Sequence, residues 1–337
     1  MPTNYKDLIY PLYFAIPLVI FRLFWESFIG VTWLWYRDHY GKTSLSENIF
    51  HHLTGGFASN SKQKRMLAGF ARLSFYIAAT IYGIIVLWDK SWLWNVEDCW
   101  IDYPFHRVPD PIWWYYMLEC GFYYSLLIAS VWDGNKSDFW ELIIHHCVTI
   151  GLLSASWTVN YVRVGTLVLL SHDTGDVFLE FCKFVRLDFN SDFITNSSTI
   201  TFLVVWLITR LVYYPLVVIR SSIYDAPSII FPEYQILNFT QAPYVPRLII
   251  LLLVVLFILH ILWTYIILKI IISAINASQP LKDLRSDTEY ESEDENGVKR
   301  KKVKTKKRHE KIETDSSDDG KSNEGQLLKA RRRNRKE

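Results

Sequence analysis

The sequence predicts an all-α protein: a polytopic membrane helical bundle of about seven spans that ends in a disordered tail. Half of its 337 residues are hydrophobic and 16% are aromatic. Charge is distributed unevenly, because residues 279–337 hold 18 of the 36 Lys and Arg and 14 of the 34 Asp and Glu. The first 278 residues are therefore only about 14% charged, against about 25% in a soluble domain. This contrast excludes a pair of ordinary soluble domains.

Seven stretches are long enough to cross a bilayer, which takes about 20 mostly apolar residues. In chain order they are 8–35, 70–88, 112–132, 140–158, 162–184, 199–220 and 247–275. The fourth and fifth stretches carry several ionisable residues, and the other five are largely apolar. Tryptophans gather where the second stretch ends and the third begins, as in the aromatic belt of a membrane interface; they are Trp88, Trp92, Trp94, Trp113 and Trp114.

Basic residues in the loops orient the bundle. The run of Lys and Arg at 299–308 places the tail in the cytosol, and an odd number of spans then places the N-terminus in the lumen. Loop 36–69, with five Lys and Arg, becomes cytosolic, whereas loop 221–246, with none, becomes lumenal. Asn238 lies in the second loop within an N-x-T sequon, so it is a candidate for glycosylation; remaining unmodified is the alternative.

The last segment, 279–337, has too few apolar residues to form a core and is predicted to be disordered. Its acidic run, 283–295, contains three candidate phosphorylation sites, or else ordinary solvated polar residues: Ser286, Thr288 and Ser292. The basic run that follows favours contact with anionic lipid headgroups. The chain thus divides into the first span with its loop (1–69), a domain of six spans (70–278) and the tail.

Ionisable side chains concentrate in the two spans between residues 140 and 184. They include His145, His146, His172, Asp173, Asp176 and Glu180. Each charge near the bilayer centre costs at least about 2.5–3.5 kcal/mol, so a cluster implies partners or a function. His172 and Asp176 share a helix face, whereas His145 and His146 point about 100° apart, so that one acts on a substrate while the other orients or binds. We expect both sets to meet in one cavity open to the cytosol.

The polar residues of these two spans also form a pattern of defined spacing. They are His145-His146, Ser156-Trp157, Asn160, Arg163, Gly165, His172-Asp173, Asp176, Leu179-Glu180 and Lys183. This pattern closely resembles the signature of the ceramide synthase family, within the TLC-domain membrane proteins. Segments 91–104 and 113–128 resemble the family too, and 283–295 resembles the acidic tail motif of many animal members. The resemblance extends over residues 65–295.

The resemblance implies N-acylation of a sphingoid base by a fatty acyl-CoA, giving a (dihydro)ceramide and CoA, with no cofactor and no metal. A histidine would deprotonate the amine, or would attack the thioester and form an acyl-imidazole that the amine resolves. Asp173 or Asp176 would hold an imidazole in its tautomer. The catalytic candidates are His145, His146, His172, Asp173 and Asp176. Those for substrate binding or structural support are Ser156, Trp157, Asn160, Arg163, Glu180 and Lys183.

Further expectations concern location and partners. Lys183 and Arg186 at the cytosolic mouth are candidates for contact with CoA phosphates, or else ordinary positive-inside anchors. The resemblance implies the endoplasmic reticulum membrane, membrane lipids as neighbours, and a homo- or hetero-dimer with related synthases as an option. Many animal members carry a homeobox-like insert after the first span. Loop 36–69 is too short for it, so no nucleic-acid contact is expected, and Trp157 replaces a frequent Tyr of the family.

Two other functions stay open at this stage. A non-catalytic TLC-domain protein would sense or transport lipid, although the retained His-His and His-Asp pairs argue against it. A di-metal lipid desaturase or hydroxylase would need several closely spaced histidine clusters, whereas this chain has adjacent pairs only at His51-His52 and His145-His146. Formation of an amide from acyl-CoA and a sphingoid base would exclude the first alternative, and activity that survives chelation would exclude the second.

Overall fold

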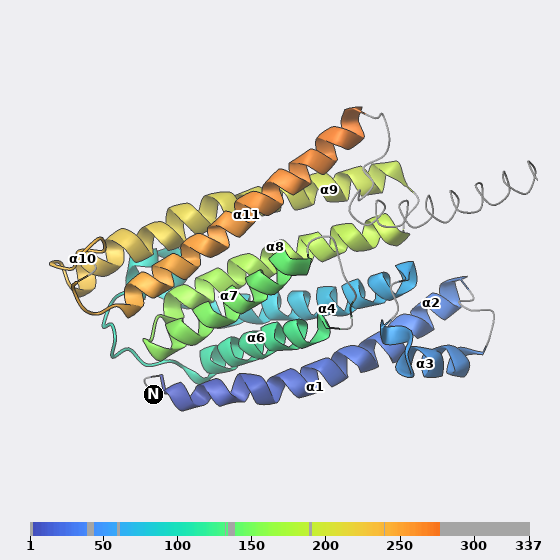
Figure 1. Cartoon of the computed structure of the whole chain (residues 1–337), viewed down its shortest axis with the longest axis horizontal. Coiled ribbons are helices and arrows are strands. Elements are labelled where there is room, and N and C mark those ends of the chain that lie inside the picture. The colour runs from blue at the N-terminus through green and yellow to red at the C-terminus, as the bar shows by residue number, and fades with distance from the viewer. Residues whose placement is uncertain are drawn as a thin grey trace, which may run out of the picture. The chain divides into compact units, whose positions relative to one another are not determined.

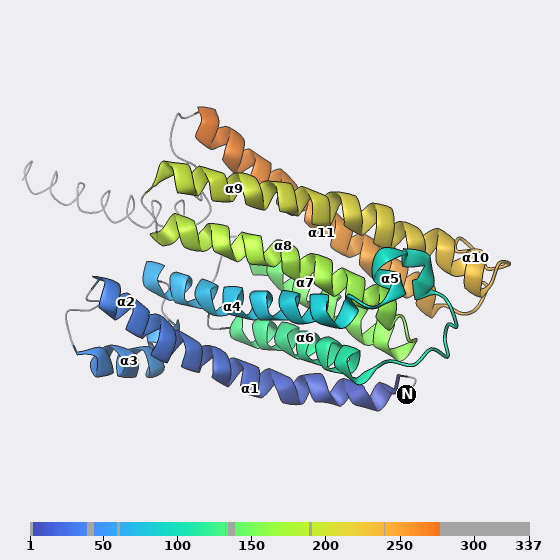
Figure 2. The same cartoon turned by 180° about the vertical axis from the view of Figure 1, so that it is seen from behind.

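The structure, a computed structural model, describes residues 3–38, 44–58, 61–131, 133, 139–188, 191–238 and 240–276. Within these ranges the chain forms helices and no β-strand. The long helices run side by side along one direction (Figures 1 and 2). The predicted all-α membrane bundle is therefore confirmed. The tail, with Ser286, Thr288 and Ser292, lies outside the described residues.

The long helices follow one another in alternating directions. They are α1 (Tyr10–Phe24), continued by η2 (Trp25–Gly30) and α2 (Val31–Asp38); α4 (Lys62–Leu87); α6 (Asp110–Ala129); α7 (Phe139–Thr158); α8 (Val162–Asp188); α9 (Asp192–Trp206), continued by η6 (Leu207–Ile219), η7 (Ser221–Asp225) and α10 (Ala226–Ile230); and α11 (Val245–Asn276). The short helices are η1 (Tyr5–Ile9), α3 (Leu45–Leu53), η4 (Gly56–Ala58), α5 (Ser91–Trp94) and η5 (Val96–Cys99).

Five of the long helices are apolar enough over sufficient length to cross a membrane: those at 5–37, 62–87, 139–158, 192–230 and 245–273. Helices α6 and α8 pack within the same bundle, α6 against α1 and α8 against α4. The chain is therefore a multi-pass membrane protein, and the count of seven spans remains a prediction. Apolar side chains such as Ile85 and Leu251, 67% and 57% exposed, face outward as expected next to lipid.

Several helices are longer than the sequence predicted. Helix α4 begins at Lys62 rather than near residue 70, because the Ser61 hydroxyl caps it by accepting a hydrogen bond from the Lys64 amide at 3.1 Å. Loop 36–69 also contains α3, which starts with a Ser44–Glu47 capping box. At the other end of the bundle the helix continues to Ile230, so the loop predicted at 221–246 shortens to 231–244.

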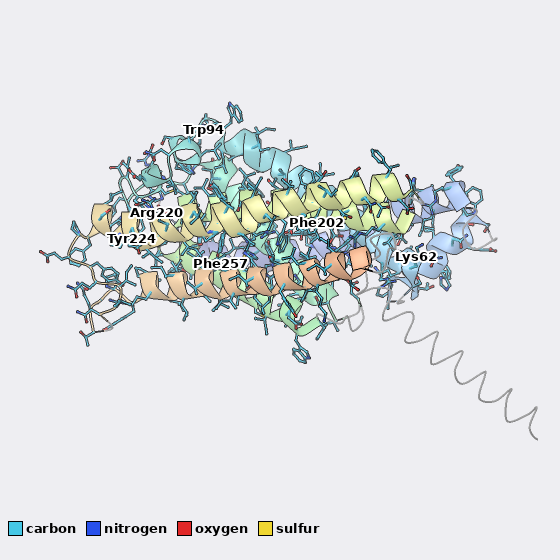
Figure 3. All side chains as sticks on the ribbon, turned by 90° about the horizontal axis from the view of Figure 1, so that it is seen from above. Lys62, Trp94, Phe202, Arg220, Tyr224 and Phe257 are labelled. Atoms are coloured by element: carbon cyan, nitrogen blue, oxygen red, sulfur yellow. The ribbon has the colours of Figure 1, made fainter. Side chains whose placement is uncertain are left out.

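The bundle has two distinct ends. The N-terminal end holds the start of the chain, the segment 88–109 and the loop 231–244, and the α3 end holds α3 and the start of α4 (Figure 1). Figure 3 shows Lys62 near the α3 end, and Trp94 and Arg220 near the N-terminal end. The sequence predicted that the α3 end lies in the cytosol and that the N-terminal end lies in the lumen.

The loop 231–244 is organised by one arginine at the start of α11. The Arg247 guanidinium donates hydrogen bonds to five backbone carbonyls, at 2.6–3.4 Å, of Gln235, Ile236, Asn238, Gln241 and Pro243. Asn238 is exposed, and its Oδ1 accepts a hydrogen bond from the Thr240 hydroxyl at 2.7 Å. Its glycosylation remains a prediction.

A network of buried charges fastens the first span at the α3 end. Glu26, which is 0% exposed, accepts from Arg22 Nε at 2.7 Å and from the Lys64 ammonium. Arg22 also binds Asp133, after α6, at 2.7 and 2.9 Å. The ring of His52 on α3 lies 3.5 Å from Glu26. The sequence predicted Lys64 to lie in the hydrophilic loop 36–69. It is instead 4% exposed and buried in an ion pair.

Candidate active site

The candidate site lies inside the bundle, where α6, α7, α8, η6 and α11 bring polar side chains together. The sequence predicted the contributions of α7 and α8 but not those of the other three helices. Within the described part of the chain, no three or more His, Cys, Asp or Glu side chains are arranged to hold a metal ion. The described side chains that meet there are imidazoles, carboxylates, phenols and the guanidinium group of Arg210.

Helix α7 supplies the two adjacent histidines. Their ring centroids are 5.7 Å apart with planes 53° from each other, and each lies 6.2 Å from the ring of Tyr123. His145 also meets Trp263 of α11 at 5.1 Å, whereas His146 is 4% exposed. Nδ1 of His145 has no hydrogen-bond partner among the described residues. The two imidazoles thus diverge, as their adjacent positions predict.

Helix α8 supplies a third histidine with a fixed tautomer. Nδ1 of His172 lies 2.8 Å from the Val168 carbonyl oxygen, which can only accept, so Nδ1 donates. In the neutral ring, Nε2 then carries the lone pair, and it has no partner within the described ranges. We expected an aspartate to fix an imidazole, but for His172 a backbone carbonyl does so. The ring lies 5.0 Å from His260 and 5.3 Å from Tyr214.

The two aspartates of α8 bind groups on other helices. Asp173, 0% exposed, accepts a hydrogen bond from the Tyr115 hydroxyl of α6 at 3.0 Å. Asp176 accepts one from Arg210 of η6 at 2.9 Å. These contacts join α8 to both neighbours. The second oxygen of Asp173, Oδ1, has no hydrogen-bond partner in the part of the chain that the structure describes.

Arg210 is the centre of the contacts between η6, α8 and α11. It is 2% exposed, and Nη2 also donates to the His172 carbonyl at 3.0 Å. Nη1 lies 3.5 Å from Nε2 of His260, which must accept because a guanidinium only donates. Arg210 and Tyr214 lie in the wide π-type turns of η6, a geometry often found at functional sites.

Sequence reasoning missed Arg210, His260 and Glu119. Each lies in a span that was predicted from its overall apolar composition, in which single polar residues carry little weight. His260 directly follows twelve residues without a polar side chain. The signal was present, since an ionisable residue inside a membrane span indicates a functional site by default.

Glu180, Lys183 and Arg186 lie further along α8 toward the α3 end. Glu180 accepts hydrogen bonds from Arg72 at 3.2 Å and from Lys183 at 2.9 Å. Arg186 donates to the Thr199 hydroxyl at 3.2 Å. These three side chains therefore bind protein groups in this structure, and contact with CoA phosphates remains a prediction.

The middle of the sequence pattern lies at the N-terminal end, away from the histidines. Ser156 is hydrogen-bonded to the Tyr116 hydroxyl, and Trp157 donates from its indole nitrogen to the Asn4 carbonyl at 3.0 Å. A Cβ at Gly165 would lie 2.5 Å from the Tyr116 hydroxyl oxygen, so only glycine fits there. These residues hold α6, α7, α8 and the N-terminus together.

Asn160 and Arg163 bind the segment 95–109 at the same end. The Asn160 amide donates to the carbonyls of Pro104 and His106 at 2.7 and 2.9 Å. Arg163 donates to two further carbonyls, at 2.8 and 3.0 Å, of Asp98 and Ile101. Asn160 also turns the chain from α7 to α8 with a positive φ of 62°, which Asn tolerates better than most residues. Their contacts are those of structural support.

Replacing Asn160 by alanine should lower the free energy of unfolding by about 3–4 kcal/mol. Two hydrogen bonds are lost at about 1 kcal/mol each, and alanine in the left-handed region adds about 1–2 kcal/mol of strain. The Asn160→Gly variant loses the same two hydrogen bonds but avoids the strain. It should therefore be more stable than Asn160→Ala by about 1–2 kcal/mol. Unfolding of both variants in mixed micelles measures these effects. Equal stability of parent and Asn160→Gly would contradict the assigned role.

Comparison with known proteins places the chain in a family. Residues 68–269 match the family model described as the TLC domain. The chain is 51% identical to ceramide synthase hyl-1 of Caenorhabditis elegans over 293 residues, which cover 86% of this chain and 79% of the relative. It is 36% identical to ceramide synthase hyl-2 of the same species, with 87% and 86% covered. It is 31% identical to ceramide synthase 4 of Homo sapiens, with 84% and 78% covered. The chain therefore belongs to the ceramide synthase family of TLC-domain membrane proteins, as its sequence pattern had indicated.

Proposed function

We propose that this chain is a ceramide synthase that transfers the acyl group of a fatty acyl-CoA to the amine of a sphingoid base. Family membership supports the reaction. The observation that carries its assignment to a site is a set of contacts inside the bundle: the rings of His145 and His146 pack on Tyr123 of α6, the ring of His172 packs on His260 of α11, and Asp173 binds Tyr115 of α6. A non-catalytic lipid-sensing protein would have no need to retain this costly set of buried ionisable groups.

His145 is the imidazole we assign to the acyl transfer. It is less buried than His146, and its Nδ1 has no hydrogen-bond partner among the described residues. In one route it takes a proton from the amine, whose nitrogen then attacks the thioester. In the other route His145 attacks first, so that the C–S bond breaks, CoA leaves as a thiolate and the acyl-imidazole passes its acyl group to the amine. In net terms, both routes break one C–S bond, form one amide C–N bond and release one CoA.

The surrounding groups position the imidazoles. His172, with its proton fixed on Nδ1, offers Nε2 as a second proton acceptor. Arg210 orients His260 and holds Asp176, and through the His172 carbonyl it fixes the helix segment that carries His172. Each of these residues is held from two helices, which restricts rotation of the rings and favours a preorganised site.

The charge distribution supports entry of acyl-CoA from the cytosol. CoA carries phosphates and cannot enter from lipid, and Lys183 and Arg186 lie toward the α3 end, which we place in the cytosol. The acyl chain would lie among the apolar helices toward the N-terminal end. We place the enzyme in the endoplasmic reticulum membrane, with the N-terminus in the lumen, and a homo- or hetero-dimer with related synthases is compatible with this arrangement.

Product analysis tests the function. Purified protein in lipid nanodiscs, supplied with sphinganine and a mixture of acyl-CoAs, should form N-acyl sphinganine and free CoA in equal amounts. The distribution of products will reveal the preferred chain length. Absence of amide under these conditions would favour the lipid-sensing alternative, and activity that disappears on exhaustive chelation would favour a metal enzyme.

A further inference from the structure

Helix α6 presents three residues of one face to the site at four-residue spacing. They are Tyr115, Glu119 and Tyr123, and each step of four residues advances about 6 Å along the helix. The Tyr115 hydroxyl binds Asp173, and the Tyr123 ring meets His145 and His146. Glu119 therefore lies between the group that holds the aspartate and the group that contacts the histidine pair.

Glu119 is buried, and the described part of the chain provides it with no compensating partner. It is 1% exposed, and its Oε2 has no hydrogen-bond partner among the described residues. Asp173 is 0% exposed, and its Oδ1 likewise has no hydrogen-bond partner among the described residues. An unpaired buried carboxylate costs several kcal/mol. Two such oxygens in one region indicate that the site is completed by a ligand that brings hydrogen-bond donors.

The charges of the site indicate which ligand fits. The guanidinium of Arg210 is paired with Asp176, and that of Arg72 with Glu180. Among the ion pairs of the described residues, none neutralises Glu119 or Asp173. When ionised, these two carboxyl groups repel the phosphates of CoA and attract a cation. Of the two substrates of the proposed reaction, only the sphingoid base carries one, an ammonium group with three N–H donors.

Resting on the proposed function, we infer that Glu119 and Asp173 bind the ammonium group of the incoming sphingoid base and that Glu119 accepts its first proton. The Tyr115 hydroxyl stabilises Asp173 as an anion, whereas Glu119 has no such donor among the described residues and takes the proton. The step converts the ammonium and the carboxylate into a neutral amine and a carboxylic acid. The amine lone pair then attacks the acyl carbon, and its second proton passes to an imidazole as the C–N bond forms.

Replacing Glu119 by glutamine tests this assignment. The KM for sphinganine should rise about tenfold or more, as expected for loss of a hydrogen bond to a charged group. The KM for acyl-CoA should stay within about twofold, because only the amine is affected. The Glu119→Asp variant keeps the charge and should restore part of the loss. Glu97→Gln makes the same chemical change at an exposed position and should leave both constants unchanged.

A second measurement uses the unaltered protein and does not depend on how the variants fold. Dicyclohexylcarbodiimide labels carboxyl groups in apolar surroundings, and peptide mass spectrometry reads the modification of Glu119. Sphinganine should protect Glu119 several-fold, and acyl-CoA alone should not. An unchanged KM for sphinganine in a folded Glu119→Gln variant, or labelling that sphinganine does not slow, would overturn the inference. Failure of the unaltered protein to form amide would instead overturn the proposed function, while protection by sphinganine would still support the binding site.

Discussion

The His145→Ala variant should form amide at least about 10²-fold more slowly than the parent, the scale typical of a lost acid–base group. His145 contacts both Tyr123 and Trp263, and its Nδ1 has no hydrogen-bond partner among the described residues. His146→Ala and Asp173→Asn should be run in parallel, because His146 shares the Tyr123 ring and Asp173 binds Tyr115. The rate of CoA release and the amide yield are the quantities to measure.

The same variants separate the two chemical routes. If His145 forms an acyl-imidazole, the parent releases up to one CoA per active site without a sphingoid base, and His145→Ala abolishes this burst. If His145 acts only as a base, neither protein shows a burst. The exposed His51 on α3 provides a matched control, and His51→Ala should retain full activity. A His145→Ala variant that is folded and as active as the parent would contradict the assignment of this residue.

Local patterns in the sequence predicted the helices better than their contacts. The apolar stretches identified the bundle, because about 20 such residues in a row have few other stable environments. They could not identify the start of α4, where the Ser61 cap includes charged residues in the helix. They also could not predict that Lys64 is buried, because its partner Glu26 is 38 residues away in sequence.

The site was predicted in part, and the reason lies in helix geometry. Ser156 follows His146 by ten residues, which is about 15 Å along a helix. The residues of this one sequence pattern therefore divide into a central group and a group at the N-terminal end. The contacts of Asp173 and Asp176 depend on how neighbouring helices are rotated, and packing determines that rotation rather than local sequence. Arg210 accordingly takes the place beside Asp176 where an imidazole was expected.

Replacing Glu26 by glutamine should lower the free energy of unfolding by about 3–5 kcal/mol, the cost of breaking a buried ion pair from one side. Glu26 is the shared acceptor of Arg22 and Lys64. Without it, the nearest carboxylate to the Lys64 ammonium is that of Asp133, at 3.9 Å. Burial lowers the pKa of His52 to about 4, so this ring is neutral at pH 7 and adds no positive charge to the network.

A double variant shows whether the loss comes from the unpaired charge. Combining Glu26→Gln with Lys64→Met removes both members of the pair and leaves Arg22 bound to Asp133, so much of the stability should return. Unfolding in mixed micelles gives the free energies, and residual acyl transfer reports whether the first span stays attached to the bundle. Because the network joins η2, α3 and α4, and none of its members is assigned to either substrate, the folded single variant should keep its KM for both substrates. A double variant less stable than Glu26→Gln alone would show that the pair itself, rather than avoidance of a lone buried cation, stabilises this end of the bundle.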